Sequence, residues 1–176
     1  MKEIIINDKN LTENDMESEV IRVKGLILNS NGKILIAHNN NTYQFPGGHV
    51  DGDESINECI VREIKEETGI NLKVTEDPFM SIVTYNQNYF GTGKKVLSKI
   101  YYYRFFTDEE PNLEETEYDE LELATDFNLF YVNFEDFDSF LEKNIESGEL
   151  DENIGREMLY VFSEYNNIFG GAEWKY

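Results

Sequence analysis

Positive charge is scarce in this sequence. Its 15 lysines and arginines are outnumbered by 36 aspartates and glutamates, which gives a formal net charge of −21. A protein that binds a nucleic-acid polymer needs lysine and arginine to displace the counterions of the phosphate backbone. The composition therefore excludes nucleic-acid polymers as expected partners, although most of the acidic residues indicate only a solvated surface.

Long apolar runs and cysteine pairs are also missing. No apolar run approaches the roughly 20 residues of a membrane span, and the first residues, MKEIIINDKNLTEND, lack the apolar region and cleavage site of a signal peptide. The single cysteine excludes an internal disulfide. We expect a cytoplasmic protein with one domain over residues 1–176, including an N-terminal extension (1–18) and a loose tail (168–176).

Short apolar runs predict a sheet. Residues 20–38 hold two runs joined by Asn31-Gly32, a strong hairpin signal because both residues tolerate positive φ. The other expected elements are an edge strand at Ile4–Ile6, strands within 71–90 and 94–106 around a Gly91-Thr92-Gly93 turn, a strand running into a helix at 129–137, and a helix at 152–165.

A helix with clear ends lies within residues 47–70, GGHVDGDESINECIVREIKEETGI. Ser55 followed three residues later by Glu58 forms a capping box, in which each side chain satisfies the other residue's backbone N–H. Gly69 suits the left-handed position that closes a helix. The sequence therefore predicts a helix from about Ile56 to Thr68, fed by a glycine-rich loop.

Three glutamates of this helix point in an unusual direction. At about 100° per residue, Glu63, Glu66 and Glu67 continue the apolar stripe, whereas Arg62 and Lys65 lie on the outward side. Carboxylates clustered and turned inward cost several kcal/mol per ion unless a cation compensates them. Hard divalent cations with oxygen ligands supply that compensation. The alternative is an ordinary solvated acidic helix face.

The spacing of nine positions sets this segment apart from an ordinary acidic helix. Seven exact matches arise by chance about once in 10⁸ placements. The positions are Gly48, Glu54, Arg62, Glu63, Glu66, Glu67 and Gly69, together with apolar Ile64 and Ile70. The pattern resembles the complete 23-residue signature of the Nudix hydrolases. That resemblance implies an α/β fold, an α/β/α sandwich with a mixed β-sheet, and Mg²⁺- or Mn²⁺-dependent hydrolysis of a nucleoside diphosphate linked to another moiety.

The resemblance also implies roles for individual residues. The residues that it implies as metal ligands are Gly47, through its carbonyl, and Glu63, Glu66 and Glu67. The residues that it implies as structural supports of the segment are Gly48, Glu54, Arg62 and Gly69. Catalysis is expected from Glu66, Glu67 and Arg62, and in many family members a glutamate on a loop like 107–122 helps to activate water. Glu120 and Glu122 are the candidates there, and Glu66 is an alternative proton acceptor.

Substrate contacts are expected outside the helix. Tyr43 and Phe45 are candidates for stacking on a base, and His49 and Lys95 are candidates for a phosphate contact. Each has a structural alternative: strand aromatics are mostly core, and an isolated loop histidine or a lysine beside a turn is more often structural or solvent-exposed. Cys59 is expected in the core.

Several functions remain open at this point. The expected partner is a small nucleotide or nucleotide-derived diphosphate, arriving as its Mg²⁺ complex because the acidic chain repels free nucleotides. Oxidised nucleoside triphosphates, ADP-ribose, nucleotide sugars and dinucleoside polyphosphates are all candidates. The alternatives are a nucleotide-metabolite sensor without turnover, a passive Ca²⁺ or Mg²⁺ site, and a diphosphate isomerase. The sequence leaves the oligomeric state open, and it is compatible with a monomer and with a homodimer.

Overall fold

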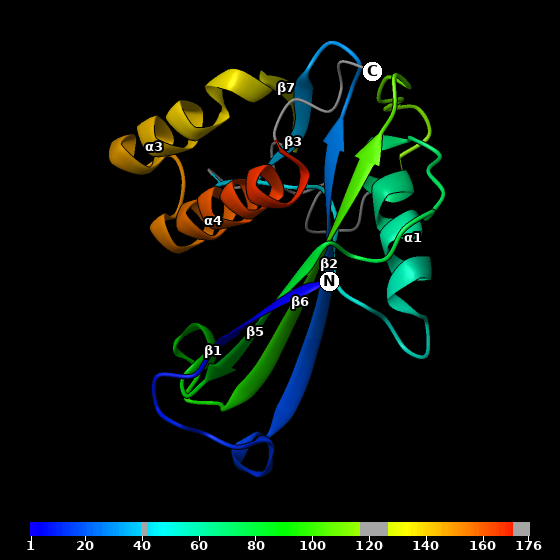
Figure 1. The fold of residues 1–176 in the computed structure, drawn as a ribbon. Helices are drawn as coiled ribbons and strands as arrows, with labels where there is room; N and C mark the ends of the chain where they lie inside the picture. Colours follow the sequence, from blue (N-terminus) through cyan, green and yellow to red (C-terminus); the bar gives the residue numbers. More distant parts are fainter. Residues whose placement is uncertain (40–41, 117–126, 171–176) are drawn as a thin grey trace.

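The protein folds as three layers in the computed structural model, which describes residues 1–39, 42–116 and 127–170. A mixed sheet is the middle layer. Helix α1 (Ile56–Thr68) covers one face, and α3 (Phe137–Ser147) and α4 (Glu152–Phe169) cover the other (Figure 1). This arrangement confirms the predicted α/β/α sandwich with a mixed β-sheet. Within the described ranges, no helix has the length and apolar character needed to cross a membrane.

Within residues 1–39, 42–116 and 127–170, the sheet has seven strands in the order β1-β5-β6-β2-β3-β4, with β7 also paired to β3. Strand β1 is parallel to β5 and β2 is parallel to β6, while the other pairs are antiparallel. The bounds are β1 Lys2–Ile6, β2 Ser18–Leu28, β3 Lys33–Asn39, β4 Thr42–Gln44, β5 Met80–Asn86, β6 Val96–Phe106 and β7 Asn128–Asn133.

Most predicted elements are present, with two corrections at their ends. The Asn31-Gly32 hairpin joins β2 to β3, and Gly32 has φ +68°. The strand predicted within residues 71–90 begins only at Met80, because Pro78 has no N–H with which to continue the ladder. Helix α4 runs on to Phe169, so the first part of the expected tail is helical, and residues 171–176 lie outside the described residues.

Alternation along β2 sorts its side chains between the two helical layers. Val23 and Ile27 belong to the apolar cluster beneath α1, and Leu26 and Leu28 belong to the cluster beneath α3 and α4. Successive strand residues face opposite sides. The even-numbered residues Arg22 and Lys24 therefore share the face of Leu26, a placement that matters for the site.

Candidate active site

Helix α1 begins and ends where the sequence predicts. Ser55 Oγ accepts a hydrogen bond from the Glu58 N–H at 3.3 Å, and Glu58 Oε2 accepts one from the Ser55 N–H at 2.8 Å. Gly69 ends the helix at φ +73°. A Cβ at Gly69 would lie 2.2 Å from the Asn112 carbonyl oxygen, so this position also needs the smallest residue for packing.

Arg62 holds several acidic groups of the site together. Its Nη1 donates to Glu63 Oε1 at 2.9 Å and to Glu66 Oε2 at 2.8 Å, and its Nη2 donates to Glu54 Oε1 at 2.5 Å and to the His49 carbonyl at 3.1 Å. This hydrogen bonding lowers the pKa of Glu54 to about 2. Although Arg62 starts from the outward side of the helix, its guanidinium turns back and orients the carboxylates.

Glu67 joins the last turn of α1 to the preceding loop. Its carboxylate is buried, and Oε2 accepts a hydrogen bond from the Gly47 N–H at 2.8 Å. The Gly47 carbonyl accepts one from Lys24 Nζ at 2.6 Å, and the same ammonium donates to Gln44 Oε1 at 3.0 Å. Burial lowers the pKa of Lys24, and the charge of Glu67 opposes that shift.

Lys24 is not among the site residues predicted from the sequence. The feature of the sequence that indicates Lys24 is a charged residue inside the apolar run VIRVKGLIL. Alternation along a strand places this residue on the same face as Leu26. A second missed group lies on the same side of the sheet, where the Tyr102 hydroxyl donates to Glu157 Oε1 at 2.5 Å. Burial raises the pKa of Glu157, opposed by its bond to Tyr102 and by the positive charges of Lys24 and Arg22.

Two glycines let the loop lie against its neighbours. Gly47 has φ +130°, and a Cβ there would lie 2.2 Å from the Val23 carbonyl oxygen. A Cβ at Gly48 would lie 2.4 Å from the carboxyl group of Glu63. The glycines thus leave room for a carboxylate directly beside the loop backbone.

The donor atoms fit a hard divalent cation. Glu54, Glu63, Glu66 and Glu67 have partly or fully buried carboxylates. Among the described contacts, Arg62 bonds to the first three, and the charge of Lys24 acts on Glu63 and Glu67. Burial raises the pKa of Glu63, while the positive charges of Arg62 and Lys24 oppose that shift. As the described side chains stand, no three acidic, histidine or cysteine residues are placed to share one ion.

The predicted substrate residues fall into different places. Phe45 is 2% exposed and stacks on Phe137 with ring centroids 5.8 Å apart, which corrects its assignment as a base-stacking residue, because its ring is in the core. Tyr43 is half-buried and contacts Phe130 and Phe140 edge-on, so its packing follows the core alternative. His49 lies at the site, where its Nε2 accepts a hydrogen bond from Arg22 Nε at 2.9 Å.

Lys95 lies at the far end of the sheet from the glycine loop. On β6, Val96 next to Lys95 pairs with Ser18 of β2. The glycine loop meets β2 at Arg22, which forms a β-bridge with His49 and pairs with Ile100 of β6. Val96 and Ile100 are four residues apart on β6, which corresponds to about 13 Å. The structure therefore does not bring Lys95 to the carboxylates. The predicted Glu120 and Glu122 lie outside the described residues.

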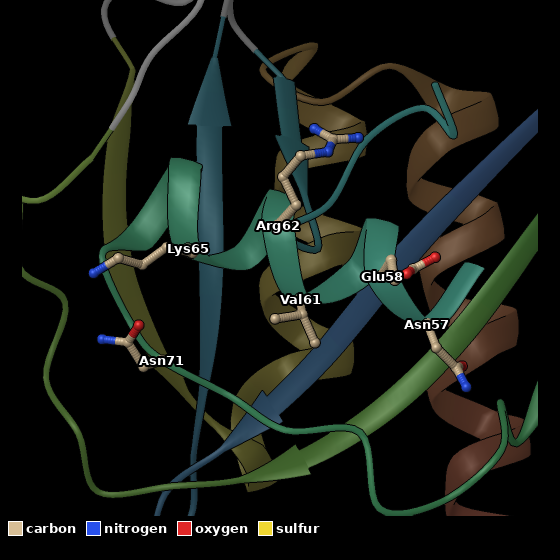
Figure 2. A pocket seen from close by; sticks show the side chains of 6 residues that line it. All are labelled: Asn57, Glu58, Val61, Arg62, Lys65 and Asn71. Carbon is tan, nitrogen blue, oxygen red and sulfur yellow. The ribbon is translucent and has the colours of Figure 1, made fainter. Parts of the chain in front are cut away.

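A hollow of about 440 Å³ lies against α1. Figure 2 shows Val61 and Asn57 on the side of the helix that faces away from the Arg62 guanidinium. The described residues that line it are Asn57, Glu58, Val61, Arg62, Lys65 and Asn71. Glu63, Glu66 and Glu67 are not among them, so we place the site at the glycine loop.

Comparison with known proteins agrees with this fold and with the glycine loop and helix. Residues 19–154 match the family model described as NUDIX domain. Because the match covers well over half of the chain, the protein belongs to the Nudix hydrolase family.

Individual relatives are similar over shorter stretches. The ADP-ribose pyrophosphatase of Methanocaldococcus jannaschii is 43% identical over 58 residues, 31% of this chain and 34% of that protein. The CTP pyrophosphohydrolase of Escherichia coli is 38% identical over 64 residues, 33% of this chain and 47% of that protein. The matches thus span about a third to a half of these curated relatives.

Solved structures share the fold. The MutT protein of Methanosarcina mazei has a TM-score of 0.54 and 24% identity, over 85% of this chain and 96% of that chain. The bifunctional NMN adenylyltransferase/ADP ribose pyrophosphatase of Francisella tularensis, solved with AMP and a manganese ion, has a TM-score of 0.53 and 19% identity, over 83% of this chain and 42% of that one.

Proposed function

We propose that the protein hydrolyses the diphosphate linkage of a nucleoside diphosphate joined to another moiety, with Mg²⁺ or Mn²⁺ as cofactor. The observation that carries the proposal is that Glu67 and Glu63 lie against the Gly47–Gly48 backbone, while Arg62 holds the carboxylate of Glu66 together with that of Glu63. A diphosphate resists attack because its negative oxygens repel a nucleophile. A site for this reaction must therefore neutralise charge and activate water.

The side chains of α1 divide this work. Glu63, Glu66, Glu67 and the Gly47 carbonyl would hold the metal, which when bound supplies charge neutralisation and a water of lowered pKa. Arg62 orients Glu63 and Glu66 through its Nη1 bonds. Glu66 is the carboxylate that we assign as proton acceptor, because its side chain is the most exposed of the three glutamates.

The relatives indicate which substrates to test first. Matched curated proteins are named for ADP-ribose and CTP, both of which contain a nucleoside diphosphate. Both matches cover less than half of those proteins, so the substrate panel must be wide. It should contain ADP-ribose, CTP, an oxidised guanosine triphosphate, a nucleotide sugar and a dinucleoside tetraphosphate.

The experiment measures release of phosphate, pyrophosphate or nucleoside monophosphate with Mg²⁺, with Mn²⁺ and with a chelator. We expect turnover of at least one compound that needs metal. Glu67→Gln should keep its fold and lose more activity than the roughly 10–100-fold cost of removing an outer-shell partner of a metal. Glu152→Gln is the matched control, because Glu152 is exposed on α4 and pairs only with Arg156 in the described contacts.

Two results would contradict the proposal. Undiminished turnover by Glu67→Gln would remove that carboxylate from the metal site. Absence of turnover across the panel, together with a rise in melting temperature on adding one of the compounds, would instead favour the nucleotide-metabolite sensor.

A further inference from the structure

An exposed aromatic ring is held in an unfavourable backbone conformation between β5 and β6. Phe90 has φ +46°, and the residue is 77% exposed. Its ring contacts that of Tyr89, with centroids 4.4 Å apart. A left-handed conformation in a residue with a Cβ costs about 1–3 kcal/mol, and exposure of a phenyl ring forfeits its burial energy. Neither feature helps the fold, which favours a role in binding.

Arg22 connects this aromatic loop to the glycine loop of the active site. Its Nη2 donates to the Tyr89 hydroxyl at 2.6 Å, and its Cζ lies 5.8 Å from the centre of the Phe90 ring. From the same side chain, Nε donates to His49 Nε2 at 2.9 Å. Since His49 is two residues from Gly47, one arginine spans the distance between the exposed ring and the predicted metal ligands.

Two cations form a row along β2 between these points. Lys24 bonds to the Gly47 carbonyl, and Arg22 precedes it by two residues on the same strand face, about 6.6 Å away. The order from α1 outward is carboxylates, Lys24, Arg22 and the Phe90 ring. In a chain with a net charge of −21, such a row suits a ligand whose phosphates come first and whose flat base comes last.

We propose that the nucleobase of the substrate stacks on the outer face of Phe90, with Arg22 as the positioning residue that fixes the ring relative to the glycine loop. This inference rests on the proposed function for the identity of the ligand. Stacking of a base on an aromatic side chain contributes about 1–3 kcal/mol and tolerates any base. Phe90 would thus provide affinity for nucleosides in general, with little discrimination among them.

A purely structural role for the ring predicts different behaviour. If Phe90 only tethered the β5–β6 loop, its removal would lower stability and disturb every ligand alike. If the ring binds a base, Phe90→Gly should melt no lower than the wild type, because glycine adopts φ +46° without a Cβ penalty. Binding of ligands that have no base should stay unchanged.

The test compares ADP with inorganic pyrophosphate by titration calorimetry in the presence of Mg²⁺. We expect Phe90→Ala and Phe90→Gly to raise the Kd for ADP by about 5- to 150-fold, the range that corresponds to loss of one stacking contact. The Kd for pyrophosphate should not move, and Phe90→Tyr should keep the Kd for ADP near the wild-type value.

Phe106→Ala is the matched control for this measurement. Phe106 is an exposed aromatic residue at the other end of the hairpin, and the Arg104 Cζ lies 5.8 Å from its ring, the same distance as in the Arg22–Phe90 pair. We expect no change in the Kd for ADP from this substitution. An equal loss of ADP affinity in both variants would overturn the assignment of the base to Phe90.

Other outcomes also overturn the inference. The inference fails if Phe90→Ala and Phe90→Gly leave the Kd for ADP unchanged, or if they weaken the binding of ADP and of pyrophosphate equally. It also fails if the wild-type protein does not bind ADP. The hydrolase proposal fails separately: if no compound is turned over but ADP binding still depends on Phe90, the protein binds nucleotides at this ring without hydrolysing them.

Discussion

The backbone N–H of Gly47 donates a hydrogen bond to Oε2 of Glu67 at 2.8 Å, although 20 residues separate the two in the chain. Glu67 is only 4% exposed, and this donor is one of the groups that compensate its buried carboxylate. The bond fixes the glycine loop against the last turn of α1. The position of the predicted metal ligands is therefore set jointly by the loop and the helix.

Gly47→Ala should disrupt this connection. Alanine does not tolerate φ +130°, and its Cβ would lie 2.2 Å from the Val23 carbonyl oxygen. We expect the free energy of unfolding in urea to fall by at least about 2–3 kcal/mol. Gly52→Ala is the control, since Gly52 has φ +54° with open space around it and should cost about 1–2 kcal/mol. Equal costs would show that the close approach at Gly47 is unimportant.

Arg62→Lys should weaken the site although it keeps the charge. One ammonium lacks the planar fork that bonds Glu54 and Glu63 at the same time. Because hydrogen bonds to charged groups contribute about 1.5–3 kcal/mol, we expect a loss in that range on urea unfolding, along with reduced turnover. Arg156→Lys, in an exposed pair with Glu152, should change stability by less than about 0.5 kcal/mol. Comparable losses in the two variants would contradict the bracing role.

The sequence was most informative where local rules decide the structure. Helix α1 has the predicted bounds because Ser55, Glu58 and Gly69 determine its ends through neighbouring backbone groups. The inward direction of Glu67 followed from helical periodicity alone. These predictions needed no knowledge of the rest of the fold.

Contacts between distant segments could not be predicted in the same way. Nothing in the sequence indicated that Lys24 would bond to the Gly47 carbonyl, or that Arg22 would join His49 to Tyr89, because these contacts depend on strand pairing. Phe45 was misassigned for the same reason. Alternation gives two possible faces for a strand residue, and only the packing of α3 decides that its ring is covered.

The Glu54–Arg62 pair should make stability depend on acid pH. The pKa of Glu54 is about 2 in the folded protein, below its usual value of 4.5. A depressed pKa stabilises the folded state above the unfolded value, and this contribution is lost as pH falls from about 4.5 toward 2. We expect the stability difference between the wild type and Glu54→Gln to be constant above pH 6 and to shrink below pH 4.5. A difference that does not change with pH would contradict this assignment.

The single cysteine offers a direct reading of how the glycine loop packs on α1. Burial raises the pKa of Cys59, and its thiol donates to the His49 carbonyl at 3.1 Å. Because the thiolate is the reactive form, the folded protein at pH 8 should react with a disulfide reagent at least about tenfold more slowly than the urea-unfolded chain. Gly47→Ala should speed the reaction if it displaces the loop, whereas Gly52→Ala should not. Rapid labelling of the folded wild type would show that the loop leaves the helix often, and the carboxylates would then lack the fixed backbone partner described above.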